Sequence, residues 1–73
     1  MDSKVIEAAI KFILSEMRQR LNEAANIAKA AQACADGGNV GRAVEIVLDV
    51  EQLTYESANL LNAASTLNRI SYV

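Results

Sequence analysis

Apolar residues recur every three or four positions along most of this chain, with one interruption near its middle. In the first half, an unbroken apolar row has alternating spacings of four and three: Ile10, Leu14, Met17, Leu21, Ala24, Ala28, Ala31 and Ala35. Such spacing places all members on one face of an α-helix. The pattern predicts a helix over residues 3–35, with Asp2 or Ser3 as its N-cap.

A second row of residues borders this predicted seam and widens it. Its apolar members are Ile6, Ile13, Ile27 and Cys34, and Arg20 is the one charged residue on that flank. Because the first row is apolar throughout, we expect it to form the contact with the rest of the protein.

The interruption is the segment 36–39, which contains two consecutive glycines. Gly37 and Gly38 follow the last periodic residue, where a glycine in the left-handed conformation commonly ends a helix. Asn39 suits the N-cap of the next helix. Since a loop this short forces the chain to reverse direction, the two helices are expected to lie antiparallel.

The second half repeats the helical pattern over residues 40–69. Its seam has a single polar member, Ser57, among Ala43, Ile46, Val50, Leu53, Ser57, Leu60, Ala64 and Leu67. The β-branched stretch 44–50 alone would also suit a strand, but the period and length of the whole segment favour a helix. The sequence therefore predicts an all-α fold, in which residues 1–73 form one helical-hairpin domain that pairs residue i with about residue 75−i.

Two rods of this kind bury only one narrow seam. Each would be about 45 Å long, and ordering some 70 residues costs on the order of 100 kcal/mol of conformational entropy. Further apolar residues lie off the predicted seams, which is typical of helices buried on more than one face. We therefore expect a homodimer that forms a four-helix bundle; the alternatives are a complex with another protein and a monomer with scattered exposed apolar residues. The residues expected to make contacts beyond the hairpin are Phe12, Val44, Leu48 and Tyr55.

Composition narrows the possible chemistry. The chain of 73 residues has no histidine, no proline and one cysteine, and its net charge is −2. The usual base near neutral pH is therefore missing, and zinc bound by Cys and His ligands of one chain is excluded. Cys34 cannot form an internal disulfide, so it is either a small, buried apolar residue or a thiol available for an intermolecular bond. We expect no enzymatic activity, no cofactor and no metal.

Two weaker functional alternatives remain open. The carboxylates Glu45 and Asp49 are spaced by four on the second helix, which would allow a metal-binding bundle, but a solvated acidic face is the favoured explanation. Arg18, Arg20 and Lys29 form a modest basic strip that would suit a nucleic-acid-binding hairpin dimer. A phosphate-binding protein usually has more clustered positive charge than this, so nucleic acid is an unfavoured partner.

Neither a signal peptide nor a membrane-spanning helix is expected. Glu7 and Lys11 interrupt the apolar run near the start of the chain, and no apolar stretch approaches about 18 residues. The sequence thus predicts a soluble, cytoplasmic, non-enzymatic interaction module: a homodimeric helical hairpin that serves as an adaptor, regulator or inhibitor of a protein partner.

Overall fold

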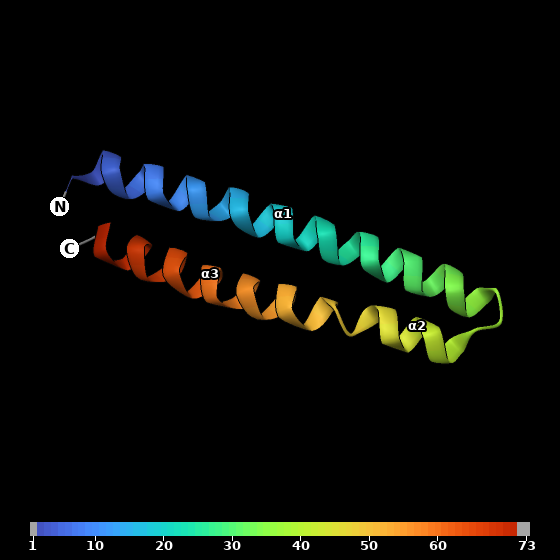
Figure 1. Ribbon diagram of the computed structural model, residues 1–73. Helices are drawn as coiled ribbons and strands as arrows, with labels where there is room; N and C mark the ends of the chain where they lie inside the picture. The colour runs from blue at the N-terminus through green and yellow to red at the C-terminus, as the bar shows by residue number, and fades with distance from the viewer. Residues whose placement is uncertain (1, 72–73) are drawn as a thin grey trace.

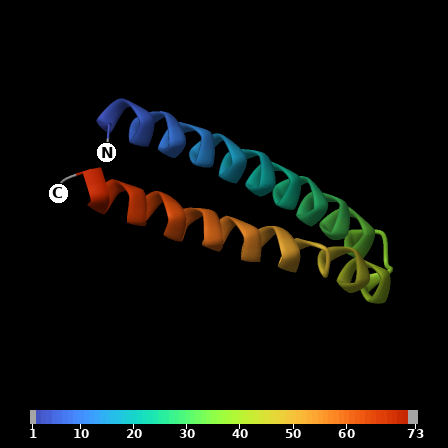
Figure 2. The ribbon, with the colours of Figure 1, turned by 60° about the vertical axis from the view of Figure 1, so that its left-hand side comes forward.

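The computed structural model describes residues 2–71, which form three helices arranged as one hairpin (Figure 1). Helix α1 spans Ser3–Asp36, α2 spans Val40–Val47 and α3 spans Val50–Ser71. Helices α2 and α3 follow one another to form a second rod antiparallel to α1, and the start of α1 and the end of α3 lie at the end opposite the turn (Figure 2). The predicted all-α helical hairpin is confirmed. It is an elongated object, with extents of 55 × 14 × 12 Å.

The turn between the rods is closed by backbone hydrogen bonds. The Gly38 amide donates to the Ala35 carbonyl at 3.0 Å, and the Asn39 amide donates to the Cys34 carbonyl at 3.1 Å. This pair of bonds is the Schellman arrangement, which needs a residue of positive φ, and Gly38 has a φ of 99°. The side chain of Asn39 then accepts from the Arg42 amide at 3.1 Å, so the predicted N-cap is confirmed.

Asp2, rather than Ser3, caps the first helix. Its carboxylate accepts a hydrogen bond from the Lys4 amide at 2.9 Å. A polar N-cap thus satisfies an otherwise free amide at the start of each rod.

The second rod is not the continuous helix predicted for residues 40–69. It is interrupted at Leu48 and Asp49, where the thin stretch of ribbon separates α2 from α3 in Figure 1. The Asp49 amide donates to Ile46, three residues back, and the Glu51 amide donates to Leu48, so the backbone tightens for one turn. Val47 and Val50 flank the tight turn; β-branched residues lower helix preference, which favours an interruption in this stretch.

The seam predicted on the second rod is confirmed despite this interruption. Ala43, Ser57 and Ala64 are buried, and the other five members of the seam are partly buried. The hydroxyl of Ser57 donates to the Leu53 carbonyl at 2.8 Å, so the one polar member of the seam is satisfied within its own helix.

On α1 the seam differs from the predicted one, and this is a correction. Leu14 and Leu21, assigned to the contact, are 52% and 48% exposed. Ile6, assigned to the border, is 2% exposed. The buried or partly buried residues of α1 are Ile6, Ala9, Ile10, Ile13, Glu16, Met17, Arg20, Ala24, Ile27, Ala31, Cys34 and Ala35.

The physical reason lies in the size of the residues that the two alternative rows offer. The rows share positions 10, 17, 24 and 31, and differ in whether α1 turns Ile13 and Ile27 or Leu14 and Ala28 toward the second rod. Near the turn, burying Ile27 removes more apolar surface than burying Ala28 would, whereas Ile13 and Leu14 are of similar size. As a consequence, Arg20 lies at the contact, where it pairs with the carboxylates of Glu16 and Glu56.

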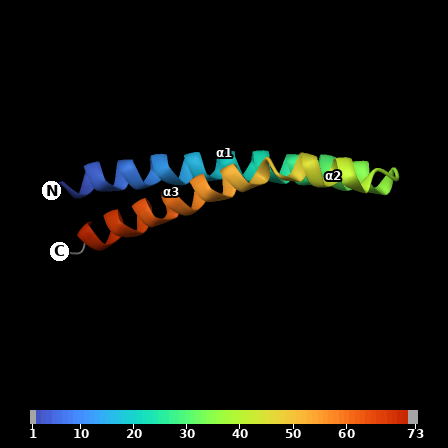
Figure 3. The same cartoon turned by 60° about the horizontal axis from the view of Figure 1, so that its bottom comes forward.

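The centre of the hairpin contact is built mainly from small side chains. Apart from Ile6, the buried residues among positions 2–71 are alanines and one serine: Ala24, Ala31, Ala43, Ser57 and Ala64. Small residues at the contact allow two helices to approach closely. Figure 3 shows the second rod crossing α1 at a shallow angle, as expected for side chains of one helix packing between those of the other.

Candidate interaction surface

Large apolar side chains remain exposed in a regular pattern on one side of the hairpin. Leu14, Leu21 and Ala28 each follow directly after a seam residue of α1, and Val47 and Leu61 do so on the second rod. We call the following residues the apolar face: Leu14, Leu21, Ala28, Val40, Val44, Val47 and Leu61. All seven are exposed.

A groove near the turn is lined by exposed apolar residues of both rods. The exposed apolar residues of α1 and those of the second rod therefore lie on the same side of the seam. It has a volume of about 360 Å³ and is lined by Ala28, Ala31, Gln32, Ala35, Val40, Ala43, Val44 and Val47. The walls therefore come from α1 and α2, and the floor includes the buried alanines of the contact. The lining side chains are almost all apolar, and their small size leaves this end of the apolar face hollow.

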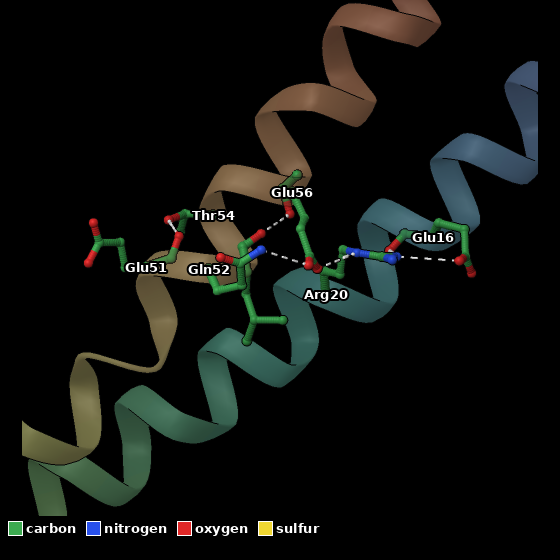
Figure 4. A network of polar contacts seen from close by, with 8 residues as sticks. Glu16, Arg20, Glu51, Gln52, Thr54 and Glu56 are labelled. Atoms are coloured by element: carbon green, nitrogen blue, oxygen red, sulfur yellow. Dashed lines mark hydrogen bonds and ion pairs between the residues drawn. The ribbon is translucent and has the colours of Figure 1, made fainter.

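The other side of the seam carries charge. Arg20 donates from Nε to the Glu56 carboxylate at 3.0 Å and from Nη1 to the Glu16 carboxylate at 3.4 Å (Figure 4). Glu16 and Glu56 each directly precede a seam residue, as Glu23 and Asp49 also do. We call these four acids, with Arg20, the acidic side; it lies across the seam from the apolar face.

The Arg20 network shifts the pKa values of Glu56 and Arg20. Hydrogen bonds from the Gln52 amide and then from Arg20 hold the pKa of the Glu56 carboxyl below its usual range. The same bond to Glu56, followed by that to Glu16, raises the pKa of the Arg20 guanidinium. The long arginine side chain thus occupies a seam position while its charged end reaches carboxylates at the rim of the contact.

The structure places the four residues predicted to make external contacts on different surfaces. Phe12, Val44, Leu48 and Tyr55 are all exposed, by 53–66%. Val44 lines the groove of the apolar face, whereas Leu48 and Tyr55 line a separate shallow hollow beside the interruption between α2 and α3. Phe12 lies on α1. The sequence-based reasoning missed Leu14 and Leu21 as surface residues, because it placed both in the seam.

The residues of the nucleic-acid alternative do not form a free basic strip. Arg20 is engaged by Glu16 and Glu56 at the rim of the seam, whereas Arg18 and Lys29 are exposed elsewhere on α1. Nothing in this arrangement gathers several cations toward one phosphate backbone.

Glu45 and Asp49, the two carboxylates of the metal-binding alternative, lie in different surroundings. Glu45 pairs with Arg42 at 3.0 Å, and Asp49 lies in the tight turn at the end of α2. Within residues 2–71, no group of three or more Cys, Asp or Glu side chains is arranged to hold a metal ion.

Cys34 is partly buried and its thiol is engaged. Sγ donates to the Asn39 carbonyl at 3.4 Å, across the turn. The side chain is therefore one of the contacts that join the end of α1 to the start of α2.

Two further findings bear on the class of protein. Among the described residues, no helix has both the length and the apolar character needed to cross a membrane. In comparisons with known proteins, the chain matches no family model, no curated protein and no solved structure.

Proposed function

We propose that this protein is a non-enzymatic interaction module that acts as a homodimer of helical hairpins. The observation that carries the proposal is the amount of surface left uncovered. The chain exposes 5375 Å², whereas a compact monomer of 7.9 kDa exposes roughly 4400 Å². The difference, roughly 1000 Å², is comparable to the 800 Å² or so that each partner buries in a standard protein–protein interface.

The composition of that surface supports association rather than an unusually long monomer. Within residues 2–71, eleven large apolar side chains are exposed, while the buried apolar residues are Ile6 and four alanines. Apolar patches of more than a few hundred Å² are rare on soluble monomers and usually mark interaction sites. A second layer of helices would complete the core that one hairpin lacks.

A role in binding a further protein fits the surfaces that a dimer would leave free. Leu48 and Tyr55 lie in a hollow together with Asp49, Glu51 and Gln52, so apolar and acidic groups are combined there. A module of this kind would serve as an adaptor, regulator or inhibitor. The non-enzymatic character is supported by the lack of histidine and by the engagement of the one thiol.

Sedimentation equilibrium at micromolar concentration tests the association. We expect a species of twice the 7.9 kDa chain mass. A monomer over the whole concentration range would refute the proposed homodimer.

The role toward a protein partner needs a separate measurement. A tagged chain and its Leu48→Glu, Tyr55→Glu variant are compared in affinity capture, after both have shown the same far-UV circular dichroism and the same mass. We expect a protein that the parent chain captures to be lost with the variant. Equal capture by both chains would exclude the hollow beside the interruption as the binding surface.

A further inference from the structure

The apolar face is uneven along its length, and this unevenness points to a specific mode of association. Its end near the turn is the groove lined by alanines and valines, about 360 Å³ in volume. Toward the chain ends it instead carries the bulky side chains of Leu14, Leu21 and Leu61, which are 48–56% exposed. One half of the face is therefore hollow and the other half protrudes.

We infer that a second copy of the chain docks on the apolar face with its turn at the opposite end, so that the leucines of each copy enter the groove of the other. This inference rests on the proposed homodimer and specifies its surface and geometry. A two-fold axis perpendicular to the rods relates the copies, so each uses the same patch. Two identical hollow-and-protrusion contacts then form, one at either end of the interface.

The alternative dimer, with both turns at the same end, fits less well. It would place groove against groove, leaving a void, and leucine against leucine, which would hold the copies apart. An unfilled apolar cavity forfeits the contacts of the side chains that line it, and overpacking imposes strain. Only the arrangement with opposite turns matches large residues with small ones over the whole face.

The charge distribution favours the apolar face over the acidic side as the place for a second copy. Glu16, Glu23, Asp49 and Glu56 all border the acidic side. Against these four acids the same side carries two arginines, Arg20 and Arg42, so a second copy docked there would bring an excess of negative charge toward the same excess, which is unfavourable. The apolar face has no charged residue among its seven members and provides the extra area that a standard interface needs.

The inferred geometry fixes where the symmetry axis crosses the hairpin. If Leu14 of one copy meets Ala35 of the other and Leu21 meets Ala28, the axis passes between residues 24 and 25 of α1. If Leu61 meets Val40, the axis passes between residues 50 and 51 of the second rod. The hairpin brings both places to the same height, since the paired walls of the groove, Ala28 with Val47 and Ala35 with Val40, follow the same pairing of i with 75−i.

A first experiment tests the surface by sedimentation equilibrium of three chains. Leu21→Glu introduces a charge into the centre of the inferred interface, and Leu48→Glu makes the same substitution at an exposed leucine outside it. We expect Leu21→Glu to raise the dimer dissociation constant at least about 30-fold, the change that marks a hot-spot residue. The constant should stay within about threefold of the parent value for Leu48→Glu. Unchanged far-UV circular dichroism of both variants shows that the hairpin itself is intact, as expected for exposed positions.

A second experiment tests the relative direction of the two copies. In a Cys34→Ala background, one sample contains the variant Ala25→Cys alone and a second contains the single variants Ala28→Cys and Val47→Cys mixed; both are oxidised with oxidised glutathione, and the disulfide-linked dimers are identified by mass. With turns at opposite ends, residue 25 lies beside residue 25 of the other copy, so we expect dimers linked 25–25. With turns at the same end, residue 28 lies beside residue 47 of the other copy, and mixed 28–47 dimers would form instead, because a disulfide requires Cα atoms within about 7 Å.

The outcomes separate the inference from the proposed function on which it rests. A monomeric parent chain would remove both. A dimer that Leu48→Glu dissociates and Leu21→Glu does not would leave the homodimer standing and overturn the inferred surface. Mixed 28–47 disulfides without 25–25 dimers would overturn the inferred direction.

Discussion

Replacing Ile6 with alanine tests the position of the seam on α1, because Ile6 is the one large side chain that the hairpin buries almost completely, at 2% exposed. The substitution deletes three buried carbon atoms, at about 0.8 kcal/mol each, so the lost transfer free energy is about 2.4 kcal/mol. Ile6 lies near the open end of the hairpin, where neighbours can move into the space, so we expect little additional cavity cost. The predicted loss is therefore in the lower part of the range of about 2–5 kcal/mol observed for such substitutions.

Val5 provides a matched control because it is the adjacent residue and is 59% exposed. Val5→Ala should change the free energy of unfolding by less than about 0.5 kcal/mol. In thermal unfolding followed by far-UV circular dichroism, at one fixed protein concentration, Ile6→Ala should lower Tm by about 10–20 °C. If both variants lower Tm equally, the packing of α1 through Ile6 is refuted.

Three further predictions concern the turn and the polar contacts. Gly38→Ala should destabilise the hairpin by about 1–2 kcal/mol in urea unfolding, because Gly38 has a φ of 99°. Gly41→Ala lies in a helix where an added Cβ would meet open space, so it should instead stabilise the hairpin by about 0.5–1 kcal/mol. Equal effects of the two substitutions would contradict the assigned turn. Asn39→Ala should cost about 1 kcal/mol through the loss of the N-cap, and an unchanged urea midpoint would show that the bond to the Arg42 amide contributes nothing. The folded-state pKa of Glu56 lies below its unfolded value, so its contribution to stability is complete above a pH of about 4.3. It should be lost as the pH falls through the lower, folded-state pKa, and an acid titration of Glu56→Gln should lack that part of the pH dependence; parallel curves for both chains would argue against the network.

The fold and one of the two seams could be predicted from the sequence because they depend on local signals. Gly38 and Asn39 specify the turn through backbone conformation and a side-chain cap, and the apolar row of the second rod has no comparably apolar competitor. On α1 there were two competing rows, sharing every second member, and a purely apolar row is the natural choice when only polarity is considered. The chain instead buries the row that contains Ile13 and Ile27, and Glu56, which is 36 positions away in sequence, supplies the carboxylate that pairs with Arg20 in that row.

The candidate surface was correspondingly only partly predictable. Val44, Leu48 and Tyr55 were identified by their position off the second seam, and they are exposed. Leu14 and Leu21 were hidden by their assignment to the wrong row. A signal that would have found them is the isoleucine content of the neighbouring row, since Ile6, Ile13 and Ile27 are separated by multiples of seven positions and large β-branched residues compete strongly for burial.

The interruption at Leu48 and Asp49 leaves α2 as a helix of 8 residues, shorter than the 12–15 or so that an isolated helix needs to persist in water. Its local stability therefore depends on the alanines of α1 beneath it, and we expect its amides to exchange with solvent by local opening before those of α3. Val40, Val44 and Val47, which wall the groove, belong to this segment. A second copy that fills the groove would close the least protected part of the chain, so folding of α2 and recognition of the other copy would be coupled steps rather than separate ones.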